Sequence, residues 1–123
     1  MEHSPGFVKL VEGILDQVSE VSAQDVHASL KNPDFVLIDV REDNEWLKDH
    51  LPGAKHMGRG IIERDIEKEI PDKEQKIVLY CGGGYRSALS AVNLQKMGYT
   101  RVLSMAGGIR GWRELNYEVS TES

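Results

Sequence analysis

The sequence is poor in cysteine: Cys81 is the single one among 123 residues. One cysteine excludes an intramolecular disulfide and any metal site built from several thiolates. The four histidines are scattered, and none stands at metal-ligand spacing from Cys81. We therefore predict no metal and no disulfide in this chain.

Positive charge and long apolar runs are also scarce. The 15 lysines and arginines stand against 20 acidic residues, which gives a net charge of -5. An acidic chain without a basic cluster is a poor binder of nucleic acid or of a membrane surface. No apolar run approaches the ~20 residues of a membrane span, and the first residues, MEHSPGFVKL, lack the pattern of a secretory signal. We predict a cytoplasmic protein with no nucleic-acid and no membrane partner.

Apolar runs alternate with helical patterns along most of the chain. Continuous apolar segments such as 35–40 and 76–81 are typical of strands buried on both faces of a parallel sheet. Shorter strands are expected at 54–57 and 101–105. Amphipathic segments, at 22–30, 44–50, 61–70, 86–97 and 109–115, separate these strands. Such alternation predicts an α/β fold with a parallel sheet.

The two ends of the chain are expected to differ from its middle. Ser4-Pro5 is typical of a helix start, and apolar residues then recur at helical spacing, so residues 1–18 are interpreted as an amphipathic helical extension. This helix needs a packing partner, which is either its own domain or a second copy; the protein is thus a monomer or a homodimer. The main domain is assigned to 19–119, and 120–123 to a frayed tail.

Cys81 stands between a buried strand and a glycine-rich loop that leads into a helix. Gly82, Gly83 and Gly84 allow the backbone to curl with its N–H groups pointing inward. The helix N-terminus adds partial positive charge and Arg86 adds a full one. These surroundings favour the thiolate and would hold an anion beside the sulfur. We interpret Cys81 as a nucleophile; the alternative is a small buried hydrophobic residue.

The loop does not have the pattern of a nucleotide site. It lacks the Gly-Lys-Ser/Thr ending of a P-loop and the spacing of a dinucleotide fingerprint.

Four stretches in register make the chain resemble the rhodanese family of sulfurtransferases, in its single-domain form. They are Leu37–Trp46 (LIDVREDNEW), His50–Ala54 (HLPGA), Val78–Ser87 (VLYCGGGYRS) and Ala106–Trp112 (AGGIRGW). The resemblance implies a five-stranded parallel sheet flanked by helices on both faces. It also implies that Cys81 takes a sulfane sulfur from a donor such as thiosulfate or a persulfide. The resulting persulfide passes its sulfur to a thiophilic acceptor, cyanide in the usual assay.

The resemblance also assigns the substrate site and its partners. The persulfide would be held by the loop that follows the nucleophile, which consists of Gly82, Gly83, Gly84, Tyr85, Arg86 and Ser87. No cofactor is required, and the partners are small sulfur anions or thiol proteins. Several rhodaneses carry a second cationic or polar side chain in this loop. Glycines stand there in this chain, which favours a protein persulfide over thiosulfate as the natural donor.

Supporting roles are expected for Asp39 and Arg41, which follow a buried strand at the same edge of the sheet. Asp39 would orient loop groups or pair with a neighbouring cation. Arg41 and Glu45 stand four residues apart and could pair with each other.

Two other readings of the loop remain. A rhodanese-like module could bind partners or sense sulfur without turnover. Cysteine phosphatases and arsenate reductases resemble this scaffold but use Cys-x5-Arg, whereas Cys81 and Arg86 are related by Cys-x4-Arg, and Tyr80 replaces the histidine typical of phosphatases. The tighter ring should suit a sulfur atom better than a phosphate.

Overall fold

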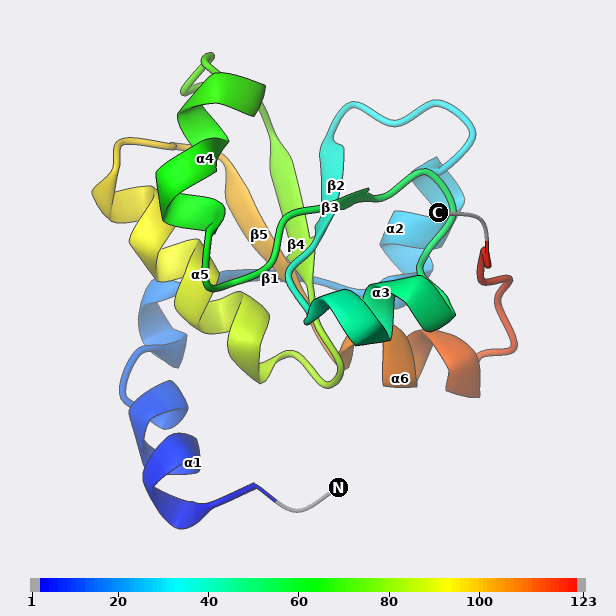
Figure 1. Ribbon diagram of the computed structural model, residues 1–123, viewed down its shortest axis with the longest axis horizontal. Helices are drawn as coiled ribbons and strands as arrows, with labels where there is room; N and C mark the ends of the chain where they lie inside the picture. The colour runs from blue at the N-terminus through cyan, green and yellow to red at the C-terminus, as the bar shows by residue number, and fades with distance from the viewer. Residues whose placement is uncertain (1–2, 122–123) are drawn as a thin grey trace.

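A computed structural model describes residues 3–121 of the chain. Five parallel strands form one sheet in the order β1-β5-β4-β2-β3 (Figure 1). The strands are β1 (Ser19–Val21), β2 (Val36–Asp39), β3 (Lys55–His56), β4 (Ile77–Tyr80) and β5 (Val102–Met105). The helices are α1 (Pro5–Glu12), the 3-10 turn η1 (Leu15–Gln17), α2 (Ala23–Ser29), α3 (Asp43–Lys48), α4 (Ile62–Glu69), α5 (Tyr85–Lys96) and α6 (Gly108–Glu114). The predicted five-stranded parallel sheet is confirmed.

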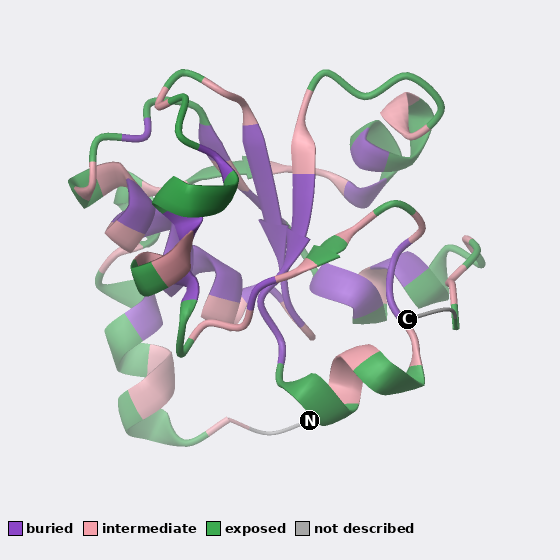
Figure 2. Cartoon of the chain, turned by 45° about the horizontal axis from the view of Figure 1, so that its top comes forward, coloured by how far each residue is buried: buried purple, intermediate pink, exposed green. Residues whose placement is uncertain are grey.

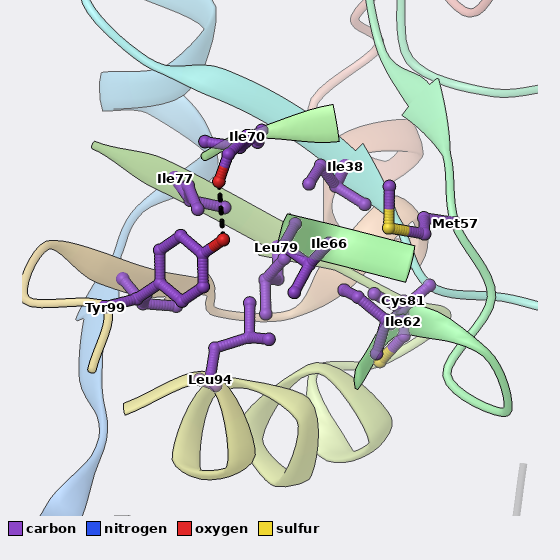
Figure 3. Close-up of a cluster of buried hydrophobic side chains, with 13 residues drawn as sticks. Ile38, Met57, Ile62, Ile66, Ile70, Ile77, Leu79, Cys81, Leu94 and Tyr99 are labelled. Atoms are coloured by element: carbon purple, nitrogen blue, oxygen red, sulfur yellow. Dashed lines mark hydrogen bonds between the residues drawn. The ribbon is translucent and has the colours of Figure 1, made fainter. Parts of the chain in front are cut away.

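Helices cover both faces of the sheet because successive residues of the central strands point in opposite directions. On β4, Ile77 and Leu79 pack in one hydrophobic core with α4 and α5, whereas Val78 and Tyr80 pack in a second core with α2 and α6. The central strands are buried along most of their length (Figure 2). Figure 3 shows the first core, with Cys81 at one end of it. β4 therefore carries Cys81 out of a tightly packed centre to the carboxyl edge of the sheet.

A buried polar network ties the ends of β2 and β4 together. The Tyr80 hydroxyl donates to Oδ2 of Asp39 at 2.7 Å and accepts the backbone N–H of Leu51 at 3.0 Å. The Arg41 guanidinium binds the same carboxylate, with Nη2 2.9 Å from Oδ2. Burial, and then the charge of Asp39, raise the pKa of the Tyr80 phenol well above its usual value. Asp39 thus pairs with the neighbouring cation, one of its two expected roles.

Replacing Tyr80 by phenylalanine tests this network. In Tyr80→Phe the Leu51 N–H and one oxygen of Asp39 each lose a buried partner. We expect the free energy of unfolding, measured with urea, to fall by about 1–3 kcal/mol. Tyr117→Phe is the matched control, since the Tyr117 hydroxyl makes no hydrogen bond within residues 3–121. Equal losses in the two variants would show that the network adds no net stability.

The N-terminal helix folds onto its own domain. Val11 of α1 is buried against Ala88 and Leu89 of α5, so the first of the two expected packing partners is the observed one. The helix is shorter than its apolar pattern suggested: α1 ends at Glu12, because Gly13 interrupts it and a 3-10 turn follows. Residues 1–2 of the predicted extension lie outside the described residues.

The start of the expected frayed tail is paired, which corrects the prediction for residue 120. Ser120 and His50 exchange two backbone hydrogen bonds, of 2.9 and 2.7 Å, in an antiparallel bridge. Trp112 adds a further anchor nearby, since its indole N–H donates to the carbonyl of Glu118 at 2.7 Å. The polar sequence gave no sign of this pairing; residues 122–123 lie outside the described residues.

Over residues 3–121, no helix is both long and apolar enough to cross a membrane.

Candidate active site

The Cys81 loop is clamped by the turn between β5 and α6. The backbone N–H groups of Ile109 and Arg110 donate to the carbonyls of Cys81 and Gly82, at 2.9 and 3.0 Å. Gly84 adopts a φ of +101°, a conformation that favours glycine, and ends the loop at the start of α5. The sharp turn after β4 therefore depends on both its own glycines and the neighbouring turn.

Cys81 is one of the residues that line a cavity of about 320 Å³. The residue is 1% exposed and shares the first core with Ile62 and Met57 (Figure 3). On its other side the sulfur has polar partners: the Gly84 N–H donates to Sγ at 3.0 Å, and the Ser87 hydroxyl lies 3.6 Å away. An N–H group that donates to the sulfur stabilises a thiolate or a persulfide. A purely apolar packing role for Cys81 would not need such a donor.

Five of the predicted loop residues divide into two groups around this sulfur. Gly82, Gly83, Tyr85 and Arg86 line the cavity, whereas the Gly84 N–H points at Sγ. Within residues 3–121, Gly84 provides the one backbone N–H that donates to the sulfur. The expected ring of several N–H groups is thus reduced to a single donor.

A hydroxyl pair lies beneath the sulfur. Ser87 is fully buried and contacts the sulfur through its side chain. Its hydroxyl is 2.7 Å from that of Ser104 on β5, a residue that sequence reasoning missed. The short strand pattern around Ser104 gave no signal that its side chain would contact the Ser87 hydroxyl.

Arg86 lies at the cavity with its charge already paired. Its Nη1 and Nη2 atoms donate to the two carboxylate oxygens of Glu45, at 2.8 and 3.2 Å. This hydrogen bonding raises the pKa of Arg86 and lowers that of Glu45 from their usual values. The expected pairing of Arg41 with Glu45 is wrong: Arg41 binds Asp39, while Glu45 reaches across to the loop. Asp39 and Arg41 are not among the residues that line the cavity.

The Glu45–Arg86 pair should make the free energy of unfolding depend on pH. Because the pKa of Glu45 is lowered in the folded protein, its contribution is present above the unfolded value of about 4.3 and is lost as pH falls through the folded value. We expect Glu45→Gln to lower the free energy of unfolding at pH 7 by up to about 1 kcal/mol. The difference from the unchanged protein should shrink below about pH 4. Chemical denaturation across pH measures it.

Glu114→Gln is the control for that experiment, since Glu114 is exposed and forms no ion pair within the described residues. A difference between Glu45→Gln and the unchanged protein that stayed constant from pH 7 to pH 3 would contradict the assigned pair.

Arg110 is a second cation at the cavity, and sequence reasoning gave it no role. It lies in the first turn of α6, and its guanidinium lies beside the loop: a β-carbon added at Gly83 would be 3.3 Å from Nη1. Within residues 3–121 no carboxylate forms an ion pair with Arg110. Its charge is therefore available to an anion in the cavity.

Comparison with known proteins decides the family. The model of the rhodanese-like domain matches residues 22–115. This chain belongs to the rhodanese-like family. The thiosulfate sulfurtransferase GlpE of Coxiella burnetii is 30% identical over 97 residues, which are 79% of this chain and 86% of that protein.

Two similar solved structures cover more of this chain than residues 22–115. The polysulfide-sulfur transferase homodimer of Wolinella succinogenes has a TM-score of 0.76 at 28% identity, over 96% of this chain and 89% of that one. A Rhodopseudomonas palustris protein of unknown function, described as a possible tyrosine phosphatase, has a TM-score of 0.78 at 26% identity and covers 98% of both chains.

Proposed function

We propose that this rhodanese-like protein is a sulfurtransferase that works through a persulfide on Cys81. The thiolate of Cys81 attacks the sulfane sulfur of thiosulfate or of a persulfide donor and forms a new S–S bond. The donor's own bond to that sulfur breaks, and its electron pair leaves with sulfite or with a thiolate. An acceptor such as cyanide then attacks the outer sulfur, and Cys81 returns to the thiolate.

One observation carries this proposal: the Gly84 N–H donates to Sγ at 3.0 Å in a residue that lines a cavity. A persulfide places its charge on the outer sulfur, and Gly82 and Gly83 line the cavity without adding a side chain to it. Arg110 supplies positive charge to the same space. The cycle needs no cofactor, because the sulfur itself carries the transferred atom.

Phosphate hydrolysis is a second candidate, since one similar structure is described as a possible tyrosine phosphatase. The loop length disfavours it: Cys81 and Arg86 are separated by four residues. The charge of the Arg86 guanidinium is moreover already paired with the Glu45 carboxylate, so less of it is left to hold a dianionic phosphate. We therefore expect no turnover of an aryl phosphate that depends on Cys81.

The proposal is tested by mass spectrometry of the intact protein after mixing with thiosulfate. We expect a gain equal to one sulfur atom, removed again by cyanide with release of thiocyanate. If no sulfane donor, including a protein persulfide, adds sulfur, then the chain is the binding or sensing module instead. We propose a cytoplasmic setting, with small sulfur anions or thiol proteins as partners, because a single cysteine without a disulfide partner is typical of a reducing compartment.

A further inference from the structure

An aromatic wall borders the Cys81 cavity, and part of it comes from outside the shared domain. His3 and Phe7, from the N-terminal segment and α1, line the cavity together with Tyr85. The ring centroids are 4.5 Å apart for His3 and Tyr85, 5.8 Å for Phe7 and Tyr85, and 5.3 Å for His3 and Phe7. The three rings thus touch pairwise and form one surface. The family match covers residues 22–115 and includes neither His3 nor Phe7.

This wall is held in place by packing. Val11, one turn after Phe7 on the same helix, is 1% exposed and lies against Ala88 and Leu89 of α5. Phe7 and Tyr85 are partly buried against the same cluster. Because α5 also starts at the catalytic loop, the position of the wall is fixed relative to the sulfur.

The charges around the cavity are arranged asymmetrically. Glu45 and Arg86 neutralise each other, whereas Arg110 has no carboxylate partner within the described residues. The cavity is therefore lined by Cys81, by a positive charge that has no carboxylate partner among residues 3–121, and by an aromatic side. Thiosulfate is a small anion without apolar surface, so it can use the charge but not the wall.

We infer that the cavity selects an organic sulfane-sulfur donor, a thiosulfonate whose apolar group packs on His3, Phe7 and Tyr85 while its sulfonyl oxygens face Arg110. This inference rests on the proposed persulfide chemistry. The Cys81 thiolate attacks the sulfane sulfur of R–SO2–S⁻ and forms the persulfide. The bond between the two donor sulfurs breaks, and its electron pair leaves on the sulfinate R–SO2⁻, so charge and electrons balance without an oxidant or reductant.

Steady-state kinetics with benzenethiosulfonate and with thiosulfate, each with cyanide as acceptor, test the inference on the full chain. We expect Phe7→Ala to lower kcat/KM for benzenethiosulfonate about two- to tenfold more than for thiosulfate, mainly through KM, since an aromatic contact contributes to binding. Leu10→Ala is the matched control: Leu10 is on the same helix, is 55% exposed and does not line the cavity. It should leave the ratio of the two donors unchanged.

Phe7→Leu separates binding from folding, because leucine keeps apolar packing on α5 but removes the ring. We expect its Tm to stay near that of the unchanged protein while the preference for the aromatic donor falls. A ratio of kcat/KM values that is the same in Phe7→Ala, Phe7→Leu and the unchanged protein would overturn the inference.

Binding to Cys81→Ala distinguishes failure of the inference from failure of the proposed function. Calorimetry with benzenethiosulfonate should show binding that weakens when Phe7→Ala is added. If benzenethiosulfonate binds in this way but the unchanged protein shows no turnover, the proposed sulfur transfer is refuted and the aromatic wall remains a ligand site. If it does not bind at all, the inference about the aromatic wall is refuted.

Discussion

Cys81→Ala should abolish sulfur transfer, with a fall in thiosulfate:cyanide turnover of more than about a thousandfold, as for loss of the attacking group in other nucleophilic enzymes. The sulfur is the one atom that forms and breaks bonds in the proposed cycle, and within the described residues no other thiol lies near it. The assay is run beside intact-protein mass spectrometry, in which the added sulfur should be absent from the variant.

The fold should survive this change. Cys81 is buried, and alanine leaves only a small void beside Ile62 and Met57. Ser90→Ala provides a matched control, because Ser90 is also small and buried, lies on α5, and its hydroxyl has no hydrogen-bond partner among residues 3–121. Turnover in Cys81→Ala within tenfold of the Ser90→Ala value would remove Cys81 from the chemistry.

Gly108→Ala should damage both stability and activity. A β-carbon at Gly108 would lie 2.6 Å from the carbonyl carbon and oxygen of Gly82 and would also collide with the carbonyl oxygen of Cys81. The φ of +58° adds strain for a residue with a side chain. Either the loop or α6 must move, and we expect a loss of about 2–5 kcal/mol in the free energy of unfolding.

Turnover measured below the lowered Tm should also fall, because the displaced backbone carries the sulfur and the loop that surrounds it. Gly111→Ala is the control on the same helix: nothing lies within 4 Å of its added β-carbon. A Gly108→Ala variant as stable and as active as Gly111→Ala would show that the close approach of α6 to the Cys81 loop does not exist in solution.

The strands and the nucleophile could be predicted from sequence because their signals are local. β2 and β4 are continuous apolar runs, and the observed limits, Val36–Asp39 and Ile77–Tyr80, fall within the predicted segments. Gly98 follows the end of α5 and has a φ of +103°, the left-handed conformation in which glycine commonly ends a helix. Such signals are local: an apolar run shows that a strand is buried, and a glycine shows where the backbone can take a left-handed conformation.

The partners of charged and polar groups could not be predicted, because folding brings them together from distant segments. Glu45 pairs with Arg86, 41 residues away, although Arg41 stands closer in the sequence. Ser104 on β5 contacts Ser87 on α5, and His3 contacts Tyr85 because the following helix, α1, packs against α5. Spacing along a helix carries no information about such contacts.

The position of α1 has a practical consequence for how relatives are compared. A protein trimmed to residues 22–115, the portion that the family shares, would retain the reactive sulfur while its substrate chamber stood open on one flank. Screening such trimmed domains would rank donors by their affinity for the loop alone. Any contribution of His3 and Phe7 to the preference for a donor would then go unnoticed.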